Sequence, residues 1–456
     1  MWYHFFLGVK EGIMHKFLFI SDFVDIQDIV VRHYSIDKGH YLAKALAHQG
    51  CKVSYMTMTQ NYRDGDMEYV SIDKLVSGFV SYFHFIVIVR EPIIPAIMDK
   101  IPAIRLLLNT PRSVRVWPKI VIKSDSPMWF TRGPFRTALN RYYQIRDEIK
   151  WLEETVDKLC VQNQKYLEQA VEYISRDQIV ITTMAVPNKI TSYTSLLNPY
   201  DPNKSYCKTD SAIIMEGDAM IPQYYIDHPD QIHRFRSNKV VLIFTGRVKV
   251  DNGKIFYNMS NIMKLLGDRY ELHLFLGSFR LPLGEDASSL STSVTAADWT
   301  KALAEERSEY KECSGKDRNN LDELRKGIFG ENSNVLIHYP YNHDDRYRYL
   351  YYADLGIDFS KVRGTDDSDM AEHAKILEYC ECGLPVVCEE KTPNSYLIKA
   401  GKNGIILPYM SSDKAYVEAI KQIVDMDIDR QACQEITVKN ENWDVRAKDF
   451  YQQLTR

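Results

Sequence analysis

The residues best suited to chemistry stand in one short segment, from His373 to Val387. The pattern predicts a short helix that carries Lys375 and Glu378 and ends at Gly383, followed by a buried strand. The first turn of such a helix presents N–H groups and partial positive charge, which suit a diphosphate. Glu378, one or two turns in, could accept two hydrogen bonds from a ribose diol. The alternative is an ordinary helix and strand with solvated charges.

A second candidate is Asp125, which directly follows the strand-like run Lys119–Ser124. In a doubly wound sheet, ligands bind at the carboxyl ends of the strands. We therefore expect Asp125 to contact either the transferred group or an acceptor hydroxyl. A role for Ser or Asp as the N-cap of the next helix is the alternative.

The stretch from Arg105 to Arg146 combines positive charge with aromatic side chains. It contains nine basic residues and one acidic residue, in a chain whose formal net charge is −4. Such a stretch suits an anionic membrane or a phosphorylated acceptor, and less well single-stranded nucleic acid. A core position for Trp117, with solvated arginines around it, is the remaining alternative. The residues expected at this surface are Trp129, Arg132, Arg136 and Arg141.

No metal site is expected. The acidic pairs at 64–66 and 366–369 lie in polar segments, where solvated carboxylates are the usual explanation. Cys380, Cys382 and Cys388 cluster in the sequence, but structural zinc sites use CxxC-type spacing, which the chain lacks. These three cysteines are therefore expected to be structural thiols.

These candidates need strands and helices to position them. Short β-branched and aromatic runs alternate with helix-length segments, and several runs are almost continuously apolar, as in parallel strands buried on both faces. The alternation predicts an α/β fold. The expected strands are His15–Ser21, Cys51–Met58, Phe83–Val89, Lys119–Ser124, Lys158–Asn163, Gln178–Met184, Lys239–Gly246, Glu271–Gly277, Asn334–Tyr339, Asp354–Phe359, Leu384–Cys388 and Gly404–Leu407.

The alternation fails over residues 187–238, a polar segment with five prolines. We therefore expect two Rossmann-like, doubly wound domains facing a cleft. The N-terminal domain is expected at 14–186, the connection at 187–238 and the C-terminal domain at 239–438.

Composition limits the class of protein. Hydrophobic residues make up 45% of the 456 and charged residues 26%, which is typical of a globular chain and excludes disorder as the main state. The net charge of −4 argues against a global nucleic-acid binder. No apolar run reaches the ~18 residues of a membrane span. A cytoplasmic location, with free thiols, is the expectation.

The motif near residue 375 resembles a known signature. Ala374-Lys375-Ile-Leu-Glu378-Tyr379, continuing to Gly383, Pro385, Val386 and Val387, is similar to the S-K-x-x-E-Y-x-x-x-G-x-P-V-V pattern of the retaining GT-B glycosyltransferases of family four, also called glycosyl transferases group 1. Lys239–Arg247 resembles the first strand of that family's nucleotide domain. Residues 442–451 resemble its closing helix, which implies that 439–456 return to the N-terminal domain.

The resemblance implies a metal-independent hexosyltransferase that moves a sugar from a nucleoside-diphosphate sugar, with UDP or GDP expected, and retains the anomeric configuration. Glu378 would bind the ribose, and Arg247 with a nearby Lys would hold the diphosphate. The family's Lys is Asn252 here, so Lys254 or Lys249 replaces it, and the family's earlier Glu is Met370. The implied donor residues are Gly246, Arg247, Lys254, Glu372, His373, Lys375, Ile376, Leu377 and Glu378; the expected catalytic residues are Asp125, Arg247 and Lys254.

The expected acceptor is a surface polysaccharide or a lipid-linked glycan, and the expected location is the inner face of the plasma membrane, as a peripheral protein. No cofactor is expected besides the sugar donor. Two alternatives remain. One is a nucleotide-sugar or glycan binding protein that kept the fold without turnover. The other is a GT-B nucleotide-sugar epimerase or hydrolase.

Overall fold

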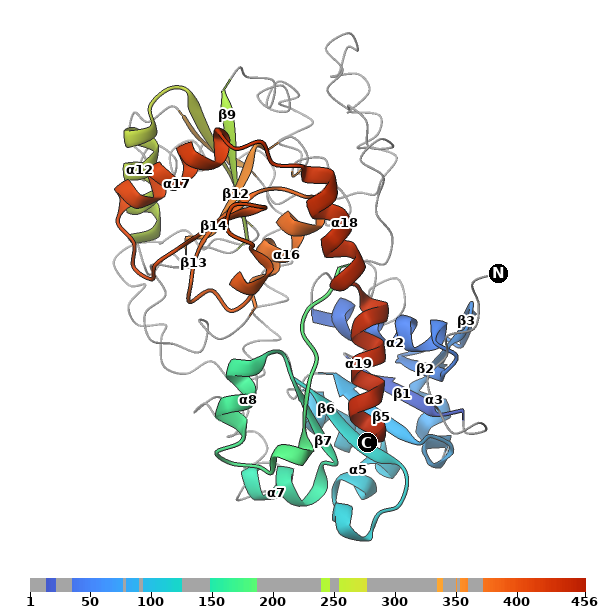
Figure 1. Cartoon of the computed structure of the whole chain (residues 1–456). Coiled ribbons are helices and arrows are strands. Elements are labelled where there is room, and N and C mark those ends of the chain that lie inside the picture. Colours follow the sequence, from blue (N-terminus) through green and yellow to red (C-terminus); the bar gives the residue numbers. More distant parts are fainter. Residues whose placement is uncertain are drawn as a thin grey trace, which may run out of the picture. The chain divides into compact units, whose positions relative to one another are not determined.

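The computed structural model describes residues 14–21, 35–76, 79–89, 93–124, 148–186, 239–246, 254–276, 334–338, 350, 353–359 and 372–456. The chain divides into two compact units (Figure 1). The first comprises residues up to Met184 together with Trp443–Arg456, and the second comprises Ala185–Asn442. The expected connection, 187–238, lies outside the described residues.

The first unit is built on an eight-stranded sheet with the order β3-β4-β2-β1-β5-β6-β7-β8. All neighbouring strands are parallel except the edge pair β3 and β4, which forms an antiparallel hairpin. β5 is fully buried and β1 is buried except at Lys16, as their apolar sequences predict. The strands are β1 (Lys16–Ile20), β2 (Lys52–Thr57), β3 (Tyr62–Asp64), β4 (Met67–Ser71), β5 (Phe85–Val89), β6 (Lys119–Lys123), β7 (Lys158–Val161) and β8 (Ile179–Ile181).

Short helices connect these strands. The described ones are α2 (Ser35–His48), α3 (Ile72–Val76), α4 (Ile94–Lys100), α5 (Pro102–Leu108), α7 (Glu148–Thr155) and α8 (Gln164–Ala170), with 3₁₀ turns at Phe79–Tyr82, Arg112–Val114 and Arg176–Gln178. Local chemistry explains several ends. The side chain of Asn163 accepts the N–H of Tyr166 and so caps α8. Gly50, at φ +87°, ends the turn after α2.

The last helix, α19 (Trp443–Thr455), belongs to the first unit although it follows the second in sequence. Trp443 stacks on Tyr41 of α2, with ring centroids 6.0 Å apart. The side chain of Gln453 both accepts from the N–H and donates to the carbonyl of Ile181, each at 3.0 Å. This amide therefore continues the hydrogen bonding of β8 at the sheet edge.

The second unit holds a parallel six-stranded sheet with the order β11-β10-β9-β12-β13-β14. Numbered along the chain within this unit, the order is 3-2-1-4-5-6, that of dinucleotide-binding Rossmann domains. The strand order reverses between β9 and β12, so the switch point lies there. The strands are β9 (Val240–Gly246), β10 (Tyr270–Leu276), β11 (Val335–His338), β12 (Leu355–Ile357), β13 (Val386–Glu389) and β14 (Gly404–Leu407).

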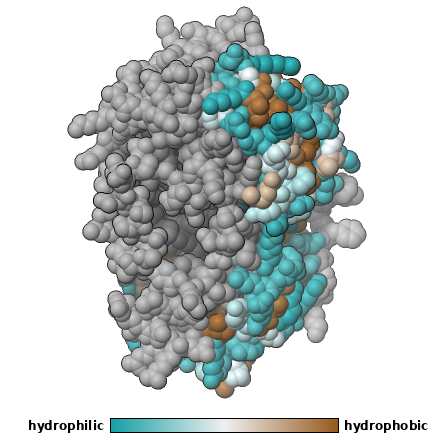
Figure 2. All heavy atoms as spheres, turned by 90° about the vertical axis from the view of Figure 1, so that its left-hand side faces the viewer, coloured by the Kyte–Doolittle hydropathy of each residue, from teal (hydrophilic) through white to brown (hydrophobic). Residues whose placement is uncertain are grey.

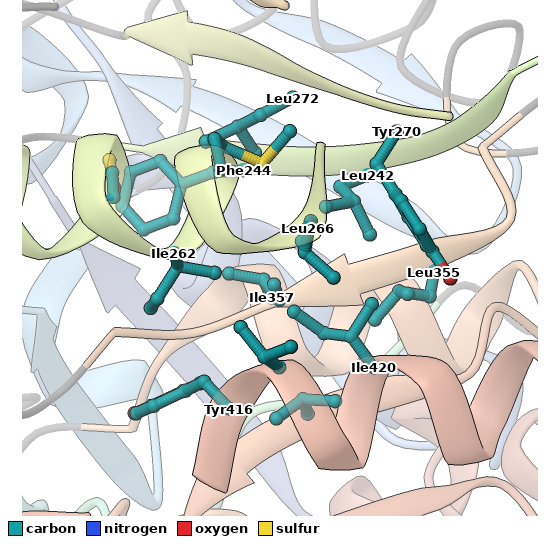
Figure 3. Packing of buried hydrophobic residues seen from close by; sticks show 14 of the residues in the cluster. Leu242, Phe244, Ile262, Leu266, Tyr270, Leu272, Leu355, Ile357, Tyr416 and Ile420 are labelled. Carbon is teal, nitrogen blue, oxygen red and sulfur yellow. The ribbon is translucent and has the colours of Figure 1, made fainter. Parts of the chain in front are cut away.

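Helices cover both faces of this sheet. The helices are α12 (Lys254–Leu266), α16 (Ala374–Glu381), α17 (Asp413–Val424) and α18 (Arg430–Asn440), with a 3₁₀ turn at Ser395–Leu397. α12 and α17 bury a cluster against Leu242, Leu355 and Ile357 (Figure 3). Gly356 lies between two of these strand residues and faces Tyr379 of α16 instead. Because side chains alternate along a strand, α16 packs on the opposite face from α12 and α17.

The predicted α/β fold is confirmed, and each predicted strand run overlaps a strand. The hairpin β3–β4 was not expected. Its turn is Asp64-Gly65-Asp66, with Gly65 at φ +57°, and Asp64 pairs with Lys44 at 3.1 Å. This acidic pair therefore forms the turn of the hairpin.

Apolar side chains collect inside each unit, where the central strands are almost wholly buried. On the face that Figure 2 shows, the described surface is mainly hydrophilic and its hydrophobic residues form small groups. Among the described residues, no helix is both long enough and apolar enough to cross a membrane.

Candidate functional site

Polar side chains gather at the switch point of the second unit. β9 ends at Thr245 and Gly246, and Asp358 directly follows β12. The N-terminus of α16 lies beside the same strand ends, because His373 and Lys375 both contact Asp358. The carboxyl ends of strands at a switch point are where Rossmann-like sheets bind their ligands.

Asp358 is the centre of a buried charge cluster. Its side chain is almost fully buried. Oδ1 accepts a hydrogen bond from the Lys375 ammonium at 2.9 Å, and Oδ2 is hydrogen-bonded to Nδ1 of His373. Burial alone would raise the pKa of Asp358, but the charges of His373 and Lys375 and their hydrogen bonds outweigh burial and hold this pKa well below its usual range. Asp358 is therefore ionised throughout the physiological pH range.

An amide clamp fixes the residue at which α16 begins. The N–H of His373 donates to Oδ1 of Asn394 at 3.1 Å, and Nδ2 of Asn394 donates to the carbonyl of His373 at 2.8 Å. The His373 side chain makes no capping hydrogen bond to the helix, since it is directed to Asp358. The first turn of α16 therefore has no side-chain cap, and its position is set by Asn394.

Tyr379 ties α16 to the sheet. Its hydroxyl accepts from the N–H of Thr245 at 2.9 Å and donates to the carbonyl of Ile243 at 3.3 Å. The ring lies directly over Gly356, where an added Cβ would be 2.4 Å from Cδ2 of Tyr379. Burial raises the pKa of Tyr379, so the hydroxyl stays neutral. Glycine at 356 thus allows the helix to approach the strand closely enough for these bonds.

Several predicted donor residues lie together on this helix. Lys375, Ile376 and Leu377 are buried in its first turn, and Glu378, one turn further, is half-buried. Glu372 is buried immediately before the helix. The arrangement can present positive charge and helix N–H groups to an anion, with a carboxylate three residues beyond Lys375.

Other predicted residues fall partly or wholly outside the description. Gly246 ends β9 at the switch point, and Lys254 begins α12, but the Lys254 side chain is not among the described ones. The residues that lie outside the described ranges are Asp125, Trp129, Arg132, Arg136, Arg141 and Arg247.

The basic stretch is partly structural. Arg115 is buried and pairs with Asp157 at 2.6 Å, and Lys119 pairs with the same carboxylate at 3.2 Å. Trp117, in contrast, is 47% exposed, with Val114 and Val116 exposed beside it. The alternative that placed Trp117 in the core is therefore wrong.

The clustered cysteines are buried thiols. Burial raises the pKa of Cys380 to about 12 and also raises that of Cys388. Both are therefore protonated at neutral pH. Within the described residues, no group of three His, Cys, Asp or Glu side chains is placed to hold a metal ion.

Asp358 and Asn394 are the site residues that sequence reasoning missed. Asp358 had a signal, because it is the charged residue at the end of a buried strand run, as Asp125 is. Asn394 had none, since it belongs to the polar turn Thr392–Ser395 and meets His373 only through the fold.

Comparison with known proteins gives the fold. No protein-family model and no curated protein match the sequence. Among solved structures, Anabaena HepE in complex with UDP and glucose is 11% identical and matches with a TM-score of 0.56 over 97% of this chain and 99% of that one. A UDP-forming α,α-trehalose-phosphate synthase from Burkholderia xenovorans is 9% identical, with a TM-score of 0.54 over the same shares of the two chains.

A glycosyltransferase from Rickettsia africae is 11% identical and matches with a TM-score of 0.54, again over 97% of this chain and 99% of that one. Structures at such low identity share a fold with this chain. They confirm the expected architecture of two Rossmann-like domains of GT-B type, over nearly the whole length of the chain.

Proposed function

We propose that this protein is a glycosyltransferase that transfers a sugar from a nucleoside-diphosphate sugar to a hydroxyl acceptor, with retention of configuration. The observation that carries the proposal is the cluster at the switch point of the second unit, where His373, Lys375 and the N-terminus of α16 meet around Asp358. The structural likeness to proteins that were solved with UDP or that form UDP supports the same choice, and makes UDP the first nucleotide to test.

The donor would bind with its diphosphate at the start of α16. Helix N–H groups and Lys375 are suited to the negative charge that grows on the departing nucleoside diphosphate. By the family resemblance, Arg247 and Lys254 would stabilise the same charge, and no metal ion would be needed. Glu378 would accept hydrogen bonds from the ribose diol.

Retention follows if the acceptor attacks the face from which the nucleoside diphosphate leaves. The bond from the anomeric carbon to the diphosphate oxygen breaks, and a bond to the acceptor oxygen forms on the same face. The acceptor proton passes to the departing phosphate oxygen, so the products are the glycoside and the nucleoside diphosphate. Asp125 is the proposed contact for the sugar or the acceptor hydroxyl.

The proposed acceptor is a surface polysaccharide or a lipid-linked glycan, reached by a peripheral protein at an anionic membrane. The exposed side chains of Val114, Val116 and Trp117, inside the basic stretch, support this choice. Charge reversal at Arg132, Arg136 and Arg141 is expected to abolish binding to phosphatidylglycerol vesicles. Unchanged binding, or none by the wild type, would contradict the membrane part of the proposal.

The second candidate is a nucleotide-sugar binding protein without turnover. Two sequence features favour it: Met370 stands where the family has Glu, and the first strand is not followed by the family's Gly-Gly. The signature of this candidate is nucleotide binding without any product. An epimerase or hydrolase would instead consume the donor with no acceptor present.

A thermal-shift screen against UDP, GDP, ADP, CMP and their sugars tests the proposal. A ligand that binds only the folded state stabilises it by about 2.7 kcal/mol at a concentration of ~100 Kd. One nucleotide series should raise the Tm of the wild type, and Glu378→Ala should lose the shift. No shift with any nucleotide, in a well-folded protein, would contradict the proposal.

A further inference from the structure

We propose that Asp358 is the positioning residue of the donor site, and that its carboxylate holds the imidazole of His373 and the ammonium of Lys375 against the donor diphosphate. The inference rests on the proposed function. It adds to that function a residue that lies outside the motif.

The contacts of Asp358 in the described site indicate that it positions other side chains. Its two oxygens are divided between two cation-forming side chains, Oδ1 with Lys375 at 2.9 Å and Oδ2 with Nδ1 of His373. Asp358 is 1% exposed and lies directly after β12, so the sheet fixes its position. Both of its oxygens are thus already engaged within the protein, while its two partners belong to the residues that open α16.

The Asp358 carboxylate also influences the protonation of His373 and Lys375. An ionised carboxylate only accepts hydrogen bonds, so the proton between Asp358 and His373 resides on Nδ1. His373 lowers the pKa of Asp358, and by reciprocity Asp358 favours the protonated imidazole. Lys375 is held on a second side, because its ammonium lies 5.0 Å from the centroid of the Phe244 ring.

The other titratable groups around Asp358 keep a constant charge near neutral pH. They are Tyr379 on α16, Cys388 at the end of β13 and Tyr416 on α17, and burial raises the pKa of each, so all three stay protonated. Glu389, also on β13, accepts from the Tyr416 hydroxyl at 2.9 Å and from the N–H of Met410 at 3.1 Å. Glu372 is buried immediately before His373 in the chain.

The charge balance has a consequence for the donor. With His373 protonated, two cations share one carboxylate, which leaves an excess of positive charge at the start of α16. Loss of the His373 proton removes that excess. The affinity for a nucleoside diphosphate should therefore fall as the pH rises through the titration of His373, and loss of Asp358 should move this fall to lower pH.

The test is calorimetric titration of the full chain with UDP, GDP and ADP between pH 5.5 and 8.5. Asp358→Asn keeps the size of the side chain but removes the charge. Asp354→Asn is the matched control, because Asp354 precedes the same strand at its other end and accepts from the N–H of Val241 at 2.7 Å. His373→Gln removes the titrating group, while its amide can still donate to Asp358.

Asp358→Asn is expected to weaken binding of the preferred nucleotide by roughly tenfold or more and to shift the alkaline fall to lower pH. Asp354→Asn should change neither quantity, whatever it does to the Tm. His373→Gln should bind the nucleotide weakly, and its affinity should not decrease as the pH rises. This variant tests the inference even if Asp358→Asn fails to fold.

Two results would overturn the inference while the proposed function stands. One is wild-type affinity and pH profile in folded Asp358→Asn, and the other is a wild-type pH profile in His373→Gln. If Asp354→Asn loses as much nucleotide affinity as Asp358→Asn, Asp358 has only a structural role, and the inference is also overturned. If the wild type binds none of the three nucleotides, the proposed function fails, and this inference fails with it.

Discussion

Glu378 is the residue on which the donor assignment depends most. It is half-buried on α16, so its removal should cost binding more than stability. Hydrogen bonds to a charged group contribute about 1.5–3 kcal/mol, so Glu378→Ala should weaken nucleotide binding roughly 10- to 100-fold with little change in Tm. Calorimetric titration measures this. Glu418→Ala, an exposed carboxylate on α17, should bind as the wild type does.

His40 gives a pH dependence to folding. Burial, with a smaller contribution from Lys44, lowers its pKa from 6.5 to about 4, although Asp64 opposes the shift. The unfolded chain therefore binds this proton more tightly than the folded one. Stability should be complete above pH ~6.5 and fall as the pH drops from there to about 4, by at most ~3 kcal/mol.

Urea unfolding at pH 7 and pH 5 measures this loss. His40→Gln can keep the hydrogen bond to the Tyr69 hydroxyl, which is 2.7 Å from Nε2 of His40, but it does not titrate. The variant should lose less stability than the wild type between these pH values. An identical loss in both proteins would show that other groups cause the dependence.

The sequence predicted those site residues that share one element. Lys375 and Glu378 stand three positions apart in a recognisable helix, so their spacing alone brings them together. Asp358 and Asn394 reach His373 from a strand end and a turn on either side of it in sequence. Only the strand order of the sheet brings these residues together, and residue spacing does not reveal that order.

At the scale of elements, the contact between α16 and β12 positions the site. An added methyl group at Gly356 would collide with the ring of Tyr379. Gly356→Ala should therefore destabilise the fold by about 1–3 kcal/mol and weaken nucleotide binding, because the helix must move off the strand. Chemical denaturation and calorimetric titration measure the two effects. A variant with wild-type stability would contradict this packing.

Elements were predictable where burial leaves a pattern. The parallel strands other than β4 are covered on both faces and read as apolar runs, which is why they were found. β4 is parallel to β2 and mostly buried, yet it was missed. All three residues of β3 are exposed, so this strand has no apolar pattern to detect. The polar turn at 64–66 then resembled an acidic loop.

At the scale of the whole molecule, α19 completes the first unit from the far end of the chain. It buries Trp443, Ala447, Phe450 and Leu454 and bonds to the edge strand β8 through Gln453. A chain that ends at Asn442 should lose hydrogen-exchange protection in β1, β5 and β8. The second unit should keep its protection and its nucleotide binding. Uniform loss in both units would contradict this division.

The whole architecture could be inferred from the sequence because the motif in the second unit is specific, whereas the first unit offers only a generic alternation of strands and helices. The alternation of strands and helices does not identify the acceptor. Side chains at strand ends and in loops determine specificity, and those positions vary independently of the core.

The central claim is that a sugar nucleotide binds at the switch point of the second unit. Hydrogen exchange with and without saturating UDP or UDP-glucose tests it most directly. We predict slower exchange in β9, in residues 355–359 and in residues 372–381, with no change at the ends of β1 and β5. Slower exchange confined to the first unit, or no change anywhere, would contradict the account.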